Sequence, residues 1–197
     1  MDKHEWQYLM EELEAAYRAD YQDDRVLVPG EGERTQPRLM LFGEAPGKEE
    51  VPQRRPFVGK AGKNLDAFLQ VLGLERSAIY ISNVVKVRPV RVIPRGTVAN
   101  TPPRHWELDF FTPWLLREIA LIRPRHLVTL GNTPLQALMG REIKIGQCHG
   151  LELPYSQEGF TCLLTPLYHP ASIIYNRSLA AVYAQDLEIL RGQLGDI

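Results

Sequence analysis

The 197-residue sequence predicts an α/β domain of three layers, in which helices cover both faces of a parallel sheet. Short apolar runs without polar alternation occur at 38–44, 78–85, 126–131 and 162–169, as expected of strands buried on both faces. Segments with apolar residues at helical spacing separate these runs. This alternation favours parallel pairing, because each helix returns the chain to the same end of the sheet.

The N-terminal part begins with an amphipathic segment and continues into a strand, a loop and a helix. The apolar face of residues 4–21 predicts a helix and consists of Trp6, Leu9, Leu13, Ala16 and Tyr17. After the strand at 38–44, a loop rich in glycine and proline extends to Gly62. The next helix places Leu65, Phe68, Leu69 and Leu72 on one face, and Gly73 ends it.

The remaining elements follow in the same alternating order. After the strand at 78–85, the proline-rich segment from Lys86 to Pro103 is expected to be a loop. A long helix reaches Ile122, and Pro113 is expected to kink it or to restart it with Thr112 as N-cap. The strand at 126–131 precedes a helix that ends at Gly140. The strand at 162–169 pairs with a hairpin arm at 151–155, and a final helix starts at Ser178.

Length and composition indicate a single domain, residues 1–197, with residues 1–24 as an N-terminal helix packed on the core. The two cysteines, and the lack of a leader or a long apolar stretch, predict a cytoplasmic protein without membrane contact, and a monomer is the default. The net charge is −1, yet residues 76–106 contain no Asp or Glu and several Arg and Lys. This segment is either a phosphate-binding surface or a solvated loop.

Polar residues and an aromatic residue lie at or near the expected carboxyl ends of the strands, where ligands bind in such folds. Each has an ordinary alternative: Glu44 as a solvated carboxylate, Phe57 as a core residue, Asn83 as a turn cap and His169 as a buried histidine. Together they suit a flat, polar ligand such as a nucleobase.

These residue types also match the chemistry of breaking an N-glycosidic bond. Phe57 can stack on a base, and the Asn83 amide offers a donor and an acceptor to its edge. His169 can donate to an oxygen that becomes negative, while Glu44 can orient water or stabilise a cationic sugar. Phosphate-loop, dinucleotide and nucleophile-elbow motifs are absent, and Cys148 and His149 lack a second ligand pair, so no metal site is predicted.

Five ordered motifs resemble the uracil-DNA glycosylase superfamily, closest to its family 4. They are "GEAPG" with "RPFVGKAG", "SNVVKVRP", "LVTLGNTPLQALMG" and "LYHPAS", within residues 25–190. The resemblance implies a three-layer αβα sandwich with a four-stranded parallel central sheet, and excision of uracil flipped out of DNA. It implies catalytic roles for Glu44 and His169 and base binding by Gly43, Phe57 and Asn83.

Family 4 proteins resemble one another in holding a 4Fe-4S cluster on four cysteines, and this chain departs from that pattern. The corresponding positions are Ala16, Ala19, Val87 and Phe111, so no cluster is expected. The apolar residues among them are expected to fill the space by packing. Further departures are Val51, Arg54 and Tyr175, the last where the family often has arginine, with Arg177 two residues later.

The leading hypothesis is therefore a DNA glycosylase that acts on a deaminated base, most plainly uracil, by base flipping. The expected phosphate contacts are Lys60, Lys86, Arg88, Arg91 and Arg177. One alternative is a member of the same superfamily that binds nucleobases or DNA with little or no turnover. A second is an enzyme of free nucleosides or nucleotides, which the extended basic segment disfavours.

Overall fold

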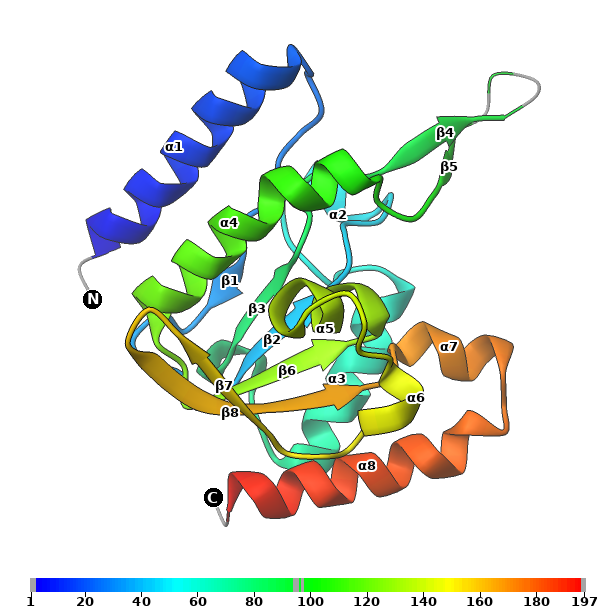
Figure 1. Ribbon diagram of the computed structural model, residues 1–197. Helices are drawn as coiled ribbons and strands as arrows, with labels where there is room; N and C mark the ends of the chain where they lie inside the picture. The colour runs from blue at the N-terminus through cyan, green and yellow to red at the C-terminus, as the bar shows by residue number, and fades with distance from the viewer. Residues whose placement is uncertain (1–2, 94–95, 97, 196–197) are drawn as a thin grey trace.

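The computed structural model describes residues 3–93, 96 and 98–195, giving the backbone alone for residues 3 and 173–175. It is an α/β fold around a mixed sheet of six strands in the order β1-β3-β2-β6-β8-β7 (Figure 1). The strands are β1 (Glu31–Gly32), β2 (Met40–Gly43), β3 (Tyr80–Asn83), β6 (His126–Leu130), β7 (Leu153–Gln157) and β8 (Phe160–Leu167).

The four strands predicted from sequence are confirmed, but the sheet is larger than the expected four-stranded parallel one. Pairs β3–β2, β2–β6 and β6–β8 are parallel, while β1 and β7 add antiparallel edges. β7 is the predicted hairpin arm. β1 has only two residues, which is too short to leave a pattern in the sequence.

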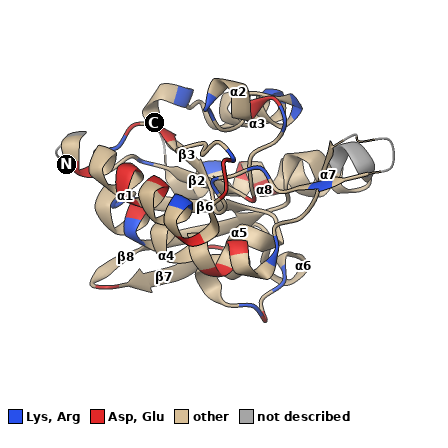
Figure 2. Ribbon diagram, turned by 90° about the horizontal axis from the view of Figure 1, so that it is seen from above, with Lys and Arg blue, Asp and Glu red and all other residues tan. Residues whose placement is uncertain are grey.

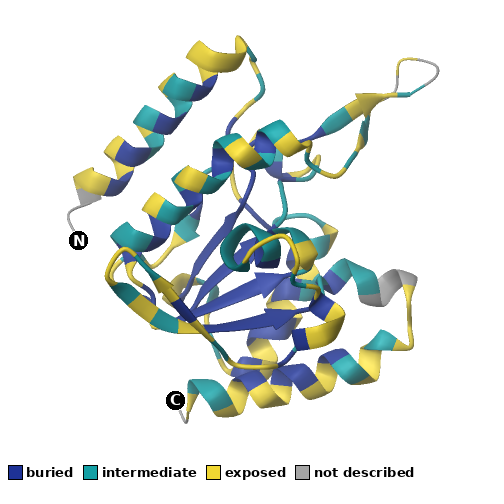
Figure 3. Cartoon of the chain, viewed as in Figure 1, coloured by how far each residue is buried: buried dark blue, intermediate teal, exposed yellow. Residues whose placement is uncertain are grey.

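Helices form a layer on each face of the sheet. They are α1 (Lys3–Tyr21), α2 (Glu50–Gln53), α3 (Lys60–Leu72), α4 (His105–Ile122), α5 (Asn132–Met139), α6 (Ile145–Cys148), α7 (Pro170–Tyr175) and α8 (Leu179–Leu194), with a 3-10 turn at Arg76–Ala78. Helices α1, α4 and α5 lie on one face, and α3 and α8 on the other (Figures 1 and 3), and the side chains of each group join a separate core cluster. None of the described helices is long and apolar enough to cross a membrane.

The buried strand β2 shows why two helical layers are needed. Met40 and Phe42 belong to the core beneath α1 and α4, whereas Leu41 belongs to the core beneath α3 and α8. Successive side chains of a strand point to opposite faces, so a strand without polar residues must be covered twice. The outer surfaces of α1 and α4 carry interspersed acidic and basic residues (Figure 2), and Arg117 on α4 pairs with Glu12 on α1 at 2.6 Å.

The structure corrects the loop expected at 86–103 and excludes one of the two outcomes expected at Pro113. The stretch expected to be a loop contains a hairpin, β4 (Val90–Val92) paired antiparallel with β5 (Val98–Asn100), which projects from the body of the protein (Figure 1). α4 runs through Pro113 as one helix and does not restart there. Pro113 and Asp109, whose carbonyl would face the missing amide, are both exposed, so water can satisfy that carbonyl.

Candidate functional site

The carboxyl ends of the four parallel strands meet at one edge of the sheet. Gly43 ends β2 and Asn83 ends β3, and these two residues are partners in the β2–β3 register. Gly131 follows β6, and its amide donates to the carbonyl of Leu167, the last residue of β8, at 2.8 Å. His169 follows β8 after one intervening residue. The fold therefore brings the predicted strand-end residues to one place.

Gly43 is held so close to its neighbours that no side chain fits there. A Cβ at this position would collide with Asn83 Oδ1 and Phe57 Cζ. Glycine is required at position 43 because Asn83 and Phe57 lie so close to its backbone. Asn83 itself is only 2% exposed. The Asn83 Nδ2 is buried and makes no hydrogen bond within the protein. Because an unpaired buried donor is costly, this amide indicates a place for an acceptor atom of a ligand.

Phe57 adopts a backbone conformation that is rare for an aromatic residue, with φ of +54°. Its amide donates to the Glu50 carboxylate, and its carbonyl accepts from Arg76 Nη1 at 3.1 Å. A Cβ at Gly62 would collide with the Phe57 carbonyl, so the start of α3 also closes on this residue. Such backbone strain costs on the order of 1–3 kcal/mol and persists only where surrounding contacts hold the conformation. It is found most often at functional sites.

His169 is oriented by the start of α7. Its Nδ1 accepts from the Ala171 amide at 3.1 Å, which places the ring proton of the neutral histidine on Nε2. Burial lowers the pKa of His169, so the ring is neutral near pH 7. Its ring is stacked with that of Phe57, with centroids 6.3 Å apart. The site thus combines an aromatic wall, an amide and a neutral imidazole N–H donor.

Two carboxylates of the loop after β2 have different surroundings. Glu44 is half-buried and accepts from Thr133 Oγ1, at the start of α5, at 2.5 Å. Glu50 is 7% exposed and accepts from the amides of Gly47 and Phe57. Burial raises the pKa of Glu50, against the effect of those two amide hydrogen bonds. Glu50 therefore shapes the loop, whereas Glu44 lies at its edge.

Sequence reasoning missed three residues that support the site. These are Glu50 and Arg76, which hold the Phe57 backbone, and Thr133, which contacts Glu44. Glu50 could have been found as a second acid within a glycine-rich motif. Thr133 and Arg76 lie far from their partners along the chain, so no local pattern points to them.

The prediction that Lys86 contacts phosphates is wrong. Its side chain is 1% exposed, and its Nζ donates to Glu118 Oε2 at 2.6 Å, to the Asn83 carbonyl at 2.8 Å and to Ser82 Oγ. Glu118 is fully buried and also accepts from the Tyr80 hydroxyl. Lys86 is therefore a buried charge that is paired and hydrogen-bonded, and it holds the backbone at the end of β3.

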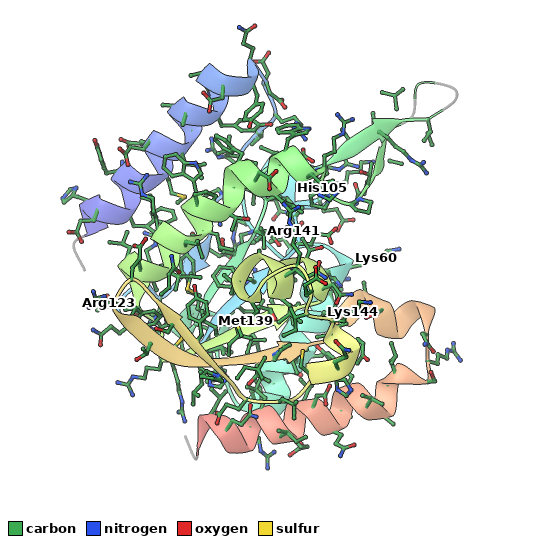
Figure 4. All side chains as sticks on the ribbon, viewed as in Figure 1. Lys60, His105, Arg123, Met139, Arg141 and Lys144 are labelled. Atoms are coloured by element: carbon green, nitrogen blue, oxygen red, sulfur yellow. The ribbon has the colours of Figure 1, made fainter. Side chains whose placement is uncertain are left out.

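The other four predicted cations belong to different elements and are exposed or half-buried. Lys60 is exposed at the start of α3 and projects outward (Figure 4). Arg88 is half-buried and donates through Nε to Asn100 Oδ1 at 2.7 Å. Arg91 is exposed on β4, and Arg177 is exposed between α7 and α8. Lys60 lines a surface groove with Gly47, Asn100 and Ala171, beside the loop that follows β2.

Comparison with known proteins agrees with this geometry. The model of the uracil DNA glycosylase superfamily matches residues 29–190. The chain belongs to the uracil DNA glycosylase superfamily. Its relatives include proteins named type-4 uracil-DNA glycosylase: that of Sulfurisphaera tokodaii is 36% identical over 83% of this chain and 73% of its own length. Those of Saccharolobus solfataricus and Thermotoga maritima are 35% and 34% identical, over 85% and 82% of this chain and 76% and 80% of theirs.

The residues at the expected cluster positions of this superfamily member do not fit an iron-sulfur cluster. Such a cluster takes four cysteine thiolates, whereas the chain contains two cysteines, Cys148 and Cys162. Of the four positions, Val87 and Phe111 are fully buried, as expected, but Ala16 is half-buried and Ala19 is exposed. Within the described part of the chain, no three His, Cys, Asp or Glu side chains are grouped to hold a metal ion.

Aromatic rings and an arginine connect the segments that contain the four expected cluster positions. The Tyr17 ring of α1 lies 5.3 Å from that of Phe111 in α4. Arg25 donates to Asp23 and Glu107, each at 2.7 Å, and to the Arg88 carbonyl at 3.2 Å. We call Asp23, Arg25 and Glu107 the Arg25 network. It joins the chain after α1 to the start of α4 and to the base of β4.

The other departures from the family pattern differ in position. Arg54 is exposed at the end of α2 with φ of +48°, and it contacts Glu14 of α1 at 3.4 Å, away from Asn83. Val51 is half-buried within α2. The side chain of Tyr175 lies outside the described residues.

Proposed function

We propose that this chain is a DNA glycosylase that hydrolyses the bond between deoxyribose and uracil flipped out of DNA, in base excision repair. The observation that carries the proposal is the buried, unpaired Asn83 Nδ2 beside Gly43 and Phe57. A site built to hydrogen-bond one edge of a base rejects ligands that cannot complete that bond. The superfamily match and the names of the relatives support the same reaction class.

Each residue of the site supplies one part of this hydrolysis. Phe57 stacks on the base, and Asn83 Nδ2 donates to a base acceptor. Negative charge develops on a base oxygen as the glycosidic bond breaks, and His169 Nε2–H donates to that oxygen. Glu44 orients the water that attacks the sugar carbon, and it stabilises the cationic sugar. The base leaves as an anion, the sugar carbon gains the hydroxyl of the water, and the other proton of that water neutralises the departed base.

The proposal includes DNA contacts by Lys60, Arg88, Arg91 and Arg177, a single domain over residues 1–197, a monomeric state and the absence of a cluster. The exposure of Lys60, Arg91 and Arg177 supports the first part, and Arg88 is half-buried beside them in the chain segment that carries Arg91. The two-cysteine composition supports the last, and iron analysis tests it: a brown protein with about four irons per chain would contradict it.

A labelled oligonucleotide with one uracil tests the function. We expect alkali-labile sites in single-stranded DNA and in duplexes that pair uracil with G or A. This product should disappear with Glu44→Ala and His169→Ala. The matched control Asn64→Asp changes a half-buried asparagine of α3, and we expect it to remain active, in contrast to Asn83→Asp. Tight binding without an abasic product from uracil, hypoxanthine or xanthine would instead indicate a nucleobase-binding protein.

A further inference from the structure

The β4–β5 hairpin exposes two apolar side chains. It projects from the body of the protein (Figure 1), so among the described residues there is no core on which they could pack. Val92 and Val98 are cross-strand partners, and they are 75% and 45% exposed. We call them the valine pair. Two exposed valines on a projecting ribbon are unusual for a surface that meets only water, since the burial of each would be favourable.

The valine pair lies on the face of the hairpin that adjoins the site. Side chains at positions i and i+2 of a strand share one face, so Val98 lies on the same face as Asn100, and Val92 on the same face as Val90. Asn100 lines the surface groove with Gly47, Lys60 and Ala171, next to the loop that carries Glu44. Two residues of strand span about 7 Å, so the valine pair continues this face just beyond the groove.

The hairpin is anchored firmly at its base. The Arg25 network binds the Arg88 carbonyl, and the Arg88 guanidinium holds Asn100 across the two strands. Asn100 of the hairpin and Ala171 of α7 line one surface groove. In Figure 1 the hairpin and α7 lie at the same side of the molecule, one above the other. Because the contacts of Arg25 and Arg88 hold the base of the hairpin in place, the valine pair can press against a partner.

The charge around the hairpin selects the kind of partner. Residues 76–106 contain no Asp or Glu, and Arg91 is exposed on the opposite face of the ribbon. An opened DNA duplex carries negative charge on its phosphates and apolar surface on the faces of its unstacked bases. It therefore fits a surface that combines an arginine with exposed valines.

We propose that the valine pair packs against the bases beside the target nucleotide and holds the duplex open while that nucleotide is flipped. The proposal rests on the proposed function, and it assigns the hairpin to double-stranded substrates. Apolar wedges of this kind offset an unstacking cost of a few kcal/mol. A single strand needs no such support, because its bases are already unpaired.

The double variant Val92→Ser/Val98→Ser tests the proposal on one sequence, offered as a single strand and as a duplex with uracil opposite G. We expect kcat/KM on the duplex to fall about tenfold, while the single-strand value stays within about twofold. 2-Aminopurine beside the uracil should brighten less on binding, because the variant unstacks the neighbouring base less. Affinity for the duplex should also fall, which anisotropy reports even without turnover.

Control variants separate the valine pair from general damage. Val92→Leu/Val98→Leu should retain duplex activity. Ile189→Ser changes a residue of α8 that is 41% exposed, and it should alter kcat/KM on neither substrate. Equal losses on single strand and duplex, or unchanged duplex affinity and fluorescence, would overturn the hairpin proposal. If the wild-type protein cleaved no uracil-containing DNA, the proposed function would be overturned instead. Duplex affinity and fluorescence would then still decide the role of the hairpin.

Discussion

The Asn83 side chain shows at the scale of one residue how a site differs from a core. Folding buries its Nδ2, and no acceptor within the protein pairs with it. An unpaired buried donor destabilises the folded state, and an acceptor atom of a ligand would remove that cost. Residues of this kind are expected to matter for activity and little for stability. Asn132 offers a contrast, because its Oδ1 accepts from the Ile145 amide at 2.8 Å.

Asn83→Ala should separate activity from stability. We expect kcat/KM for uracil-containing DNA to fall by about 100-fold or more, because the base loses its edge partner. The free energy of unfolding in urea should change by less than about 1 kcal/mol, since no hydrogen bond of Nδ2 is lost. Asn132→Ala is the control, with reduced stability and retained activity. The reverse result for the two variants would remove Asn83 from the site.

Thr133 tests the placement of Glu44. Thr133→Val keeps the shape but removes the hydroxyl that donates to Glu44 Oε2. We expect about tenfold lower kcat, because the carboxylate loses the group that orients it, and recovery with Thr133→Ser. Thr112→Val changes a half-buried threonine of α4 that lines a second surface groove together with Thr133, and it serves as control in the same steady-state assay. Full activity of Thr133→Val would show that Glu44 needs no positioning.

At the scale of elements, α1, α4 and β4 meet around the Arg25 network. Glu107 caps α4 by accepting from the Arg104 amide and also receives Arg25, although its side chain is only 2% exposed. One guanidinium thus fixes the start of a helix and the base of the hairpin. Tyr17 joins the same group, because its hydroxyl donates to Asp23 and accepts from Arg25.

Arg25→Gln should destabilise the protein by about 2 kcal/mol, because Glu107 would keep a buried charge without its cation. Urea unfolding measures this loss. Arg18→Gln removes an exposed pair with Glu14 on the same helix, and it should cost less than about 0.5 kcal/mol. Similar losses in the two variants would mean that the Arg25 network is an ordinary surface ion pair.

Elements with a long regular pattern were predictable, and those fixed by distant partners were not. The apolar run at 38–44 predicted β2 because burial on both faces excludes polar residues. β4 and β5 have three residues each, too few to show a period. Lys86 stands in a basic segment that resembles a surface, and its burial depends on Glu118, 32 residues later. The meeting of Gly43, Asn83 and His169 at one edge of the sheet was predictable, because parallel strands end together.

At the scale of the whole molecule, His126 couples the sheet to pH. It is 4% exposed at the start of β6, and its Nε2 lies 2.9 Å from Thr165 Oγ1 in β8. Burial lowers its pKa from 6.5 to about 4. The unfolded chain therefore binds a proton between these values that the folded protein does not, so stability is full above pH 6.5 and falls as the pH drops toward 4.

Urea unfolding at pH 7 and pH 4.5 should reveal this dependence, with a loss attributable to His126 of about 2–3 kcal/mol. The His126→Gln variant can keep a hydrogen bond to Thr165 but does not titrate, so it should flatten this part of the profile. His169, whose pKa burial also lowers, contributes in the same direction. An unchanged slope in His126→Gln would assign the acid sensitivity to other groups.

The junction of α1, α4 and β4 also bears on the conditions under which the protein survives. It consists of aromatic rings, one guanidinium and two carboxylates, and none of these is a sulfur ligand. These residues offer no thiolate that air or peroxide could oxidise. Burial raises the pKa of Asp23, but hydrogen bonds from Tyr17 and Arg25 outweigh it and hold that pKa below its ordinary value. Asp23 therefore stabilises the junction above the ordinary pKa of a carboxyl, and this contribution is lost as the pH falls through the lowered pKa.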